Sequence, residues 1–428
     1  MKISRYREFT SSLLQPGVRL LALRSDRFKT ARVRIYLLEP LQAVQATQTA
    51  LLAGVLRAGT ASHPTRRDLA RACENLYGAA IGASVTRFAD AQALVGYADF
   101  PAERFLPKGS KELDGVLGLL CELLTQPALD RSGSAFRADV LQQERQQLEF
   151  ELKALADEKP SWAAWLASQR VYAGTPGAVH EQGSLDDLPG ISAEQLFQRH
   201  QSLLRNARVL AFVTGPLDEK RGLAALARHL RLPASARPAL PLPGLLPHRQ
   251  RPVRDVVKDN TEQTHLIAAY TGGARYGDAD YAAALFADGI FGGFSFSRLF
   301  KVVREEHGLA YAVGSHYQRA RGVIMAQAAV DPAKAEKAAA LIQSELKRLA
   351  KDGFSSDEFE ACRASLVESR QSAWDSPTSR ASDAVFQAVL GFKQAPEAQL
   401  KAVRAVKPAA VRAALKALRL HTEFRYGT

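Results

Sequence analysis

Apolar and polar residues alternate in several short runs of the chain, as they do in β-strands with one buried face. Residues 31–37 carry alanine, valine, isoleucine and leucine at every second position. A period of two predicts a strand. We expect this strand to form a hairpin with residues 18–23, and we expect further strands at residues 79–86, 92–100 and 209–214.

Helical spacing of apolar residues fills the intervals between these strands. A three-to-four residue period predicts amphipathic helices that cover the sheet. We expect Gly59 and Gly78 to end the first two helices, because glycine adopts the left-handed conformation common at helix C-termini. The predicted helices lie at residues 41–57, 67–77, 116–124 and 136–157, and after the capping box at 192–195.

Prolines divide the chain near its middle. Six of the 20 prolines lie between Pro233 and Pro252, where helical and strand patterns are almost absent. Proline fixes φ and removes a backbone donor, so we expect an extended linker there. Beyond it, the order of elements begins again, with strands at 264–270, 310–317, 323–330 and 423–426, and helices at 281–289 and 297–305 and after residues 332 and 355.

Individual residues support an internal repeat. Leu69, Gly78 and Ala80 match Leu299, Gly308 and Ala310 at one offset, 308 − 78 = 230. A repeat this long indicates duplicated domains. We therefore predict an α+β protein of two homologous domains, each a mostly antiparallel sheet packed with helices. The predicted ranges are 1–232 for the first domain, 233–252 for the linker and 253–428 for the second domain.

Composition narrows the choice of function. The 428 residues carry a formal net charge of +13, which fits a nucleic-acid binder, but the arginines are scattered and no nucleic-acid-binding motif accompanies them. We expect no nucleic acid partner. An apolar stretch long enough for a signal peptide or a membrane span is absent, so we expect a cytoplasmic protein. Cys73, Cys121 and Cys362 are too far apart for a metal or redox pair.

Several short motifs give the chain a resemblance to a known family. They are Leu-Arg-Ala-Gly-Thr at 56–60, Leu-Tyr-Gly-Ala at 76–79, Glu-Arg at 144–145, Phe-Gly-Gly at 291–293, and Leu-Phe-x-x-Val-Arg-Glu-x-x-Gly-Leu-Ala-Tyr at 299–311. With the order of elements, they resemble the pitrilysin or insulinase-like zinc peptidases of the processing-peptidase type. The resemblance implies the LuxS/metalloprotease-like fold. It is greatest to the degenerate insulinase-like proteins associated with modification of elongation factor P.

The resemblance also shows what this chain lacks. Active members of the family carry His-x-x-Glu-His on the first long helix, where two histidines hold zinc and the glutamate is a general base. The equivalent positions here are Ala50, Ala53 and Gly54, and the nine histidines offer no pair at that spacing. Glu144 matches the third zinc ligand, and Glu151 matches a carboxylate that follows it. We therefore expect no metal in this chain and interpret both glutamates as polar remnants on a long helix.

Other matched positions imply substrate binding. The family keeps an arginine and a tyrosine at the positions of Arg304 and Tyr311, where they hold the substrate backbone and the developing oxyanion. Its glycine-rich stretch, here Gly292 and Gly293, faces the peptide chamber. The residues alone leave other interpretations open: a surface ion pair of Arg304 with Glu305 or Glu306, a simple strand residue at Tyr311, and a turn between helices at the glycines.

The resemblance then implies a divided active site. In two-chain members of the family, the second domain of one subunit closes over the zinc-bearing domain of the other. We therefore expect a non-catalytic subunit of a heterodimeric zinc metallopeptidase, with zinc in the partner and a peptide as substrate. Whether the chain forms a homodimer when alone stays open. Two alternatives remain: a peptide-binding scaffold without proteolysis, and a metallopeptidase with an atypical metal site around Glu144.

Overall fold

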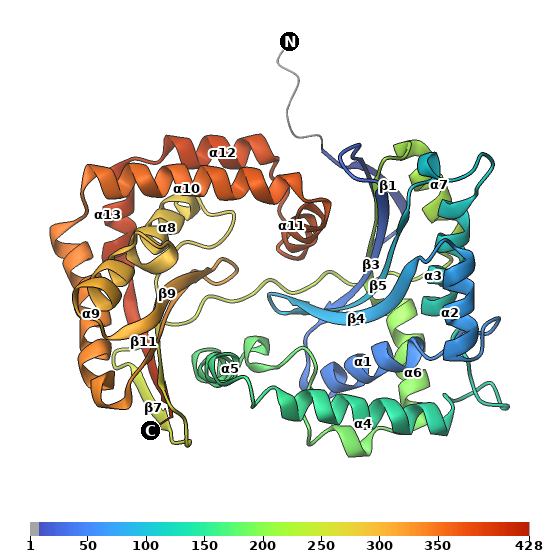
Figure 1. The fold of residues 1–428 in the computed structure, drawn as a ribbon, viewed down its shortest axis with the longest axis horizontal. Coiled ribbons are helices and arrows are strands. Elements are labelled where there is room, and N and C mark those ends of the chain that lie inside the picture. Colours follow the sequence, from blue (N-terminus) through green and yellow to red (C-terminus); the bar gives the residue numbers. More distant parts are fainter. Residues whose placement is uncertain (1–7, 428) are drawn as a thin grey trace, which may run out of the picture. The chain divides into compact units, whose positions relative to one another are not determined.

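The computed structural model describes residues 8–427, which form two compact units (Figure 1). The first unit contains the chain up to Ala154, together with Val179–Leu242 and Pro377–Val389. The second contains Leu155–Ala178, Pro243–Ser376 and the chain from Leu390 onward. Each unit is built on one β-sheet.

The sheet of the first unit has six strands in the order β1-β2-β6-β3-β5-β4. Neighbouring strands are antiparallel except for β2 and β6, which are parallel. The strands are β1 Thr10–Gln15, β2 Val18–Arg24, β3 Thr30–Pro40, β4 Ala80–Phe88, β5 Ala91–Pro101 and β6 Arg208–Gly215.

The predicted hairpin between residues 18–23 and 31–37 is wrong. β6 lies between β2 and β3 and pairs with both of them. β6 is apolar and buried over nearly its whole length, as expected for a strand covered on both faces in the middle of a sheet. A tight turn signal shows that the chain reverses, but it does not show whether a distant strand is inserted.

Helices cover one face of this sheet (Figure 1). α1 and α3 contact β4 and β5, α6 contacts β3, and α7 contacts β1, β2 and β6. The predicted helices at 41–57, 67–77, 116–124 and 136–157 correspond to α1 to α4. The elements are α1 Ala43–Leu56, α2 Arg66–Asn75, α3 Glu112–Thr125, α4 Ala138–Ala154, α6 Ala193–Asn206 and α7 Glu219–His229, with 3₁₀ turns η1 Glu103–Phe105 and η3 Leu188–Gly190.

The opposite face of the first sheet is covered by α11 (Pro377–Val389), which comes from much later in the chain. Val385 and Val389 of α11 are buried in one cluster with Tyr36 and Phe212 of the sheet. The Tyr36 and Phe212 rings meet edge to face, with centroids 5.7 Å apart. The first unit therefore needs a helix from the second half of the sequence to complete its core.

The sheet of the second unit has five strands in the order β7-β11-β8-β10-β9. β7 and β11 are parallel and the other pairs are antiparallel, so the order repeats that of the first sheet without β1. β4 and β9 also begin and end at the predicted offset, since 310 − 80 = 230 and 318 − 88 = 230. The two related α+β halves are confirmed. The strands are β7 Val253–Val257, β8 Thr264–Thr271, β9 Ala310–Gln318, β10 Val323–Val330 and β11 Arg419–Tyr426.

Most helices of the second unit cover one face of this sheet, where Phe286, Leu349 and Phe359 contribute to a large buried cluster. The elements are α8 Tyr281–Asp288, η4 Gly289–Gly293, η5 Phe300–Glu306, α9 Ala335–Asp352, α10 Ser356–Asp375, α12 Pro396–Ala405 and α13 Pro408–Ala417, with 3₁₀ turns η2 Pro176–Ala178 and η6 Pro332–Lys334. η4 and η5 are π-helical.

The other face of the second sheet is covered by α5 (Lys159–Val171), from the first half of the sequence. Its Ala163, Ala167 and Val171 pack on the sheet. α5 and α11 each have 13 residues and occupy equivalent places in the repeat, since 377 − 159 = 218 and 389 − 171 = 218. The compact units thus exchange two helices, whereas the predicted domain ranges follow the chain.

Local predictions near the boundaries had mixed outcomes. Residues 233–249 form neither helix nor strand, as expected for the linker. Gly78 and Gly308 have φ of +74° and +56° and end their helices as left-handed residues. Gly59 does not have this role. A side chain there would come within 2.7 Å of the Pro64 backbone, so close approach of two backbone segments explains the glycine.

No helix among residues 8–427 is long and apolar enough to cross a membrane.

Candidate functional site

The positions equivalent to the family's zinc-binding motif lie in the buried part of α1. Ala50 and Ala53 are 8% and 4% exposed, and Gly54 is buried beside them. α1 packs on α4 and on the sheet. The methyl side chains of Ala50 and Ala53 can neither bind a metal nor accept a proton. This stretch of α1 is therefore ordinary helix core.

The side chain of Glu144 on α4 packs closely against Gly54. A Cβ at position 54 would lie far inside van der Waals contact with the Glu144 carboxylate. The Glu144 side chain, 5% exposed, thus lies against the bare backbone of α1. The glycine on α1 and the carboxylate on α4 are parts of one packing arrangement.

Two arginines compensate the buried charge of Glu144. The Arg66 guanidinium donates a hydrogen bond to Glu144 Oε1, and Arg57 Nη2 lies 4.0 Å from Oε2. Arg66 is the first residue of α2, whose start is fixed because Thr65 and Asp68 form a capping box. The carboxylate that the resemblance places at the third zinc-ligand position is here one half of an ion pair.

Glu151 lies seven residues further along α4 and is half buried. It accepts a hydrogen bond of 2.8 Å from Gln147 Nε2 on the same helix. Among the described residues, no three histidine, cysteine, aspartate or glutamate side chains gather as a metal site would require. Because Glu144 is the only donor at the motif positions and guanidinium groups surround it, these residues do not fit zinc.

The predicted substrate-binding glycines do not form a loop. Gly289–Gly293 continue α8 as one π-helical turn, η4, which packs on β9. A Cβ at Gly292 would lie 2.7 Å from the Ser315 backbone nitrogen, so this buried glycine allows η4 to approach the strand. Gly293 is exposed, with the Asp288 carboxylate 3.1 Å from where its Cβ would lie. Only Gly293 offers bare backbone to an incoming chain.

Arg304 and Tyr311 are brought together on the surface of the second unit. Arg304 lies on η5, and its guanidinium carbon is 4.6 Å from the Phe300 ring centroid and 5.2 Å from that of Tyr311. Tyr311, near the start of β9, is 81% exposed. Among the described residues no ion pair joins Arg304 to Glu305 or Glu306. The guanidinium and the phenol therefore form one exposed group of donors, held by stacking.

A buried carboxyl beside the glycine turn was missed by the sequence analysis. Asp288, the last residue of α8, is 8% exposed, and Ser315 Oγ donates a 2.6 Å hydrogen bond to its Oδ1. Burial raises the pKa of Asp288 to about 6, although the serine hydrogen bond lowers it. An acid directly before the glycine-rich run was the available signal, but its serine partner lies 27 residues away.

Comparisons with known proteins agree with this arrangement. Residues 190–366 match the family described as "Peptidase M16 inactive domain". The chain is 28% identical over 347 residues to "Probable inactive metalloprotease YmfF" of Bacillus subtilis (strain 168), which covers 80% of each protein.

Solved structures show the same fold. A conserved protein from Enterococcus faecalis V583 superposes with a TM-score of 0.89 at 23% identity, and covers 98% of each chain. A structure titled peptidase M16 inactive domain, from Pseudomonas fluorescens, gives a TM-score of 0.79 at 19% identity, also over 98% of each chain. The chain is thus a homologue of proteins described as inactive M16-family metalloproteases, and its residues at the zinc positions do not fit the metal.

Proposed function

We propose that this chain is the non-catalytic subunit of a heterodimeric insulinase-like zinc metallopeptidase in the cytoplasm. In this proposal, the zinc belongs to a partner subunit of the same family, and this chain supplies groups that bind the peptide substrate. Arg304, Tyr311 and the turn that carries Gly292 and Gly293 act in trans on the partner's site.

The observation that carries the proposal is a contrast between two sets of residues. The zinc positions of the first unit are occupied by Ala50, Ala53 and Gly54, and Glu144 is neutralised by arginines. In the second unit, Arg304 and the 81% exposed Tyr311 lie side by side on the surface. An exposed pair of donors held in place by stacking is available to a ligand that binds there.

The chemistry of the pair suits a scissile peptide. The guanidinium donates hydrogen bonds and cannot accept them, and the phenol can donate its O–H to a substrate carbonyl. Such donors stabilise a carbonyl oxygen more as it gains negative charge, so they favour the transition state over the bound peptide. Stacking on Phe300 and Tyr311 restricts the long Arg304 side chain before substrate arrives.

The test uses the complex of the full chain with its zinc-bearing relative and a fluorogenic peptide. Arg304→Ala is expected to lower kcat/KM about 100-fold and Tyr311→Phe about tenfold, in line with the loss of single oxyanion donors. Arg412→Ala and Tyr77→Phe serve as controls, because Arg412 also stacks on an aromatic ring and Tyr77 is also exposed. Full activity of the Arg304 and Tyr311 variants would contradict the proposed role.

The partner is to be found by affinity capture from native cells at endogenous expression, followed by zinc analysis and a peptidase assay of the captured material. We expect an M16-type subunit with near-stoichiometric zinc and peptidase activity. Capture of this chain alone, with peptide binding but no cleavage, would instead indicate the scaffold function. Zinc bound to the isolated chain would support a metal site around Glu144.

A further inference from the structure

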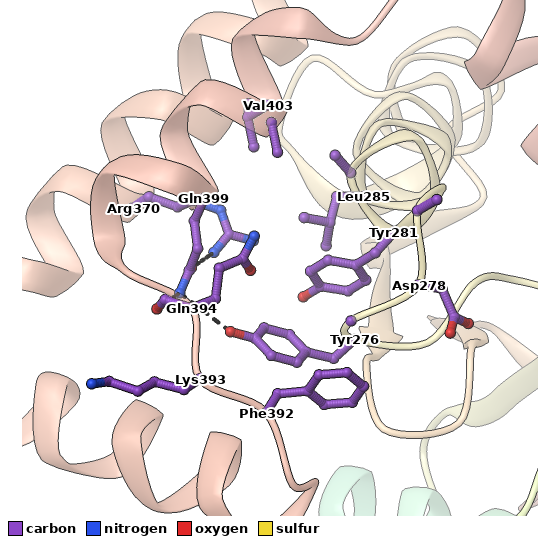
Figure 2. A pocket seen from close by; sticks show the side chains of 14 residues that line it. Tyr276, Asp278, Tyr281, Leu285, Arg370, Phe392, Lys393, Gln394, Gln399 and Val403 are labelled. Carbon is purple, nitrogen blue, oxygen red and sulfur yellow. Dashed lines mark hydrogen bonds between the residues drawn. The ribbon is translucent and has the colours of Figure 1, made fainter.

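The second unit contains a cavity at the N-terminal end of α8, away from the glycine turn that continues the C-terminal end of the same helix. Its volume is about 350 Å³, a size typical of small-molecule sites. α8, α10, α12 and the connection before α12 all contribute side chains to its lining (Figure 2).

One wall of the cavity is aromatic. The Tyr276 ring meets Tyr281 at 5.1 Å and Phe392 at 6.1 Å between centroids, both edge to face. Gly277, with φ of +95°, allows this packing because a Cβ there would collide with the Phe392 ring. Leu285 and Val403 add aliphatic surface, so the cavity can bury an apolar group.

Polar groups converge at one side of these rings, as Figure 2 shows. Arg370 Nη1 donates a 2.8 Å hydrogen bond to Gln399 Oε1, and Gln399 Nε2 donates a 3.2 Å bond to the Tyr276 hydroxyl. Gln399 is 5% exposed, so this chain of hydrogen bonds is anchored in the protein interior. The guanidinium is thereby fixed at the edge of an apolar cavity.

The charges that line the cavity favour an anion. Arg370 and Lys393 are the cations of the lining, and Asp278 is its acid. Asp278 Oδ2 already accepts a 2.7 Å hydrogen bond from the Arg275 backbone nitrogen and lies 3.7 Å from Arg275 Nε. Its charge is therefore compensated locally, and Arg370 is the cation whose position in the lining suits an anion.

We propose that this cavity binds a small amphipathic carboxylate with an aromatic or branched aliphatic group. The carboxylate pairs with Arg370, whose planar fork suits it, and the apolar group lies against Tyr281 and Leu285. The site is separate from the substrate-binding residues of the proposed function and does not depend on them.

The test is calorimetric titration of the full chain with N-acetyl-phenylalanine and with its uncharged amide. We expect the acid to bind in the millimolar range or tighter and the amide at least about tenfold more weakly, because a charged hydrogen-bonded pair is lost. Arg370→Gln should weaken binding of the acid by a similar factor and leave binding of the amide unchanged.

Two further variants make the result specific to the cavity. Ala282→Phe fills the space without removing a polar group and should abolish binding of both probes. Lys401→Gln removes an exposed cation of α12 outside the cavity and should change the affinity less than about twofold. Any of three results would overturn the proposal. They are equal affinity for acid and amide, no binding of the acid up to ~10 mM, and unchanged binding by the Ala282 variant.

Discussion

Glu144 of the first unit and Asp288 of the second are both buried carboxyl groups beside a glycine. They differ in the groups that surround them. The Glu144 carboxylate contacts the guanidinium of Arg66 and lies 4.0 Å from that of Arg57. Asp288 accepts its side-chain hydrogen bond from the neutral Ser315 hydroxyl, and burial raises its pKa to about 6. The Glu144 carboxylate is paired with an arginine, whereas burial favours the protonated form of Asp288.

The two carboxyl groups therefore respond differently to the loss of a neighbouring cation and to a rise in pH. An ion pair of a buried carboxylate ties two helices together, and removal of the cation leaves an uncompensated charge. A protonated carboxyl needs no cation but becomes costly as the pH rises. The first arrangement is purely structural, whereas the second lies directly beside the exposed Gly293.

The glycines themselves provide the strongest test. Gly292→Ala would place a Cβ 2.7 Å from the Ser315 backbone, and β9 cannot retreat because β10 pairs with it. We expect a loss of about 3 kcal/mol in the free energy of unfolding, measured by denaturant titration. Gly293→Ala, the neighbouring control, should cost less than about 1 kcal/mol. Equal losses would mean that η4 adapts to both side chains.

The pH dependence of stability separates the two carboxyls. Asp288 titrates near 6 in the folded chain and near 3.8 when unfolded, so between these values the folded chain holds the extra proton. Its contribution to stability is complete below pH 4 and is lost as the pH rises to about 6, by about 2 to 3 kcal/mol. Urea titrations at pH 4 to 7 should show this fall in wild type, and Asp288→Asn should remove it. Asp352→Asn serves as the control. If stability still falls with pH in the Asp288 variant as it does in wild type, the raised pKa does not belong to Asp288.

Removal of the Arg66 side chain should destabilise the protein, because the buried Glu144 carboxylate loses its nearest cation. Arg66→Ala leaves Glu144 with only the distant Arg57, and we expect a loss of about 2 kcal/mol, below the full cost for a buried pair because Arg66 is 53% exposed. Arg67→Ala on the same helix is the control. Added zinc or a chelator should leave the melting temperature of both proteins unchanged. A zinc-dependent rise would show that Glu144 takes part in a metal site.

A smaller effect is expected at Gly54. Gly54→Ala forces the Glu144 carboxylate to move, and a flexible side chain can do so at a cost of about 1 kcal/mol. In the Glu144→Ala background the same change should be nearly neutral, so a double-mutant cycle should report a coupling of about 1 kcal/mol. Additive losses would mean that some other contact makes position 54 intolerant.

Much of the fold could be predicted from the sequence because the patterns that indicate helices and strands are local. Alternation over residues 79–86 located β4, and the matched Gly78 and Gly308 both end helices with positive φ. No local pattern indicated that α5 and α11 would each cover the sheet formed by the other half of the chain. Amphipathic spacing shows that a helix has an apolar face, but it does not show which sheet that face will cover.

The candidate site was predictable to the same extent. Short motifs indicated Ala50, Gly54, Arg304 and Tyr311 as candidate positions. The partners that give these positions their chemistry are distant in sequence: Arg66 lies 78 residues from Glu144, and Ser315 lies 27 residues from Asp288. Long-range pairs of this kind are decided by tertiary packing, which no single motif encodes.

The exchanged helices also set an order of events during synthesis. When Leu242 has left the ribosome, the sheet face that carries Tyr36 and Phe212 still lacks α11, which begins 377 − 242 = 135 residues later. At ordinary elongation speeds that interval lasts roughly 7 to 27 seconds. The nascent chain therefore presents an uncovered apolar surface while most of the second unit is made, and its yield in the cell should depend on chaperones that bind during this interval.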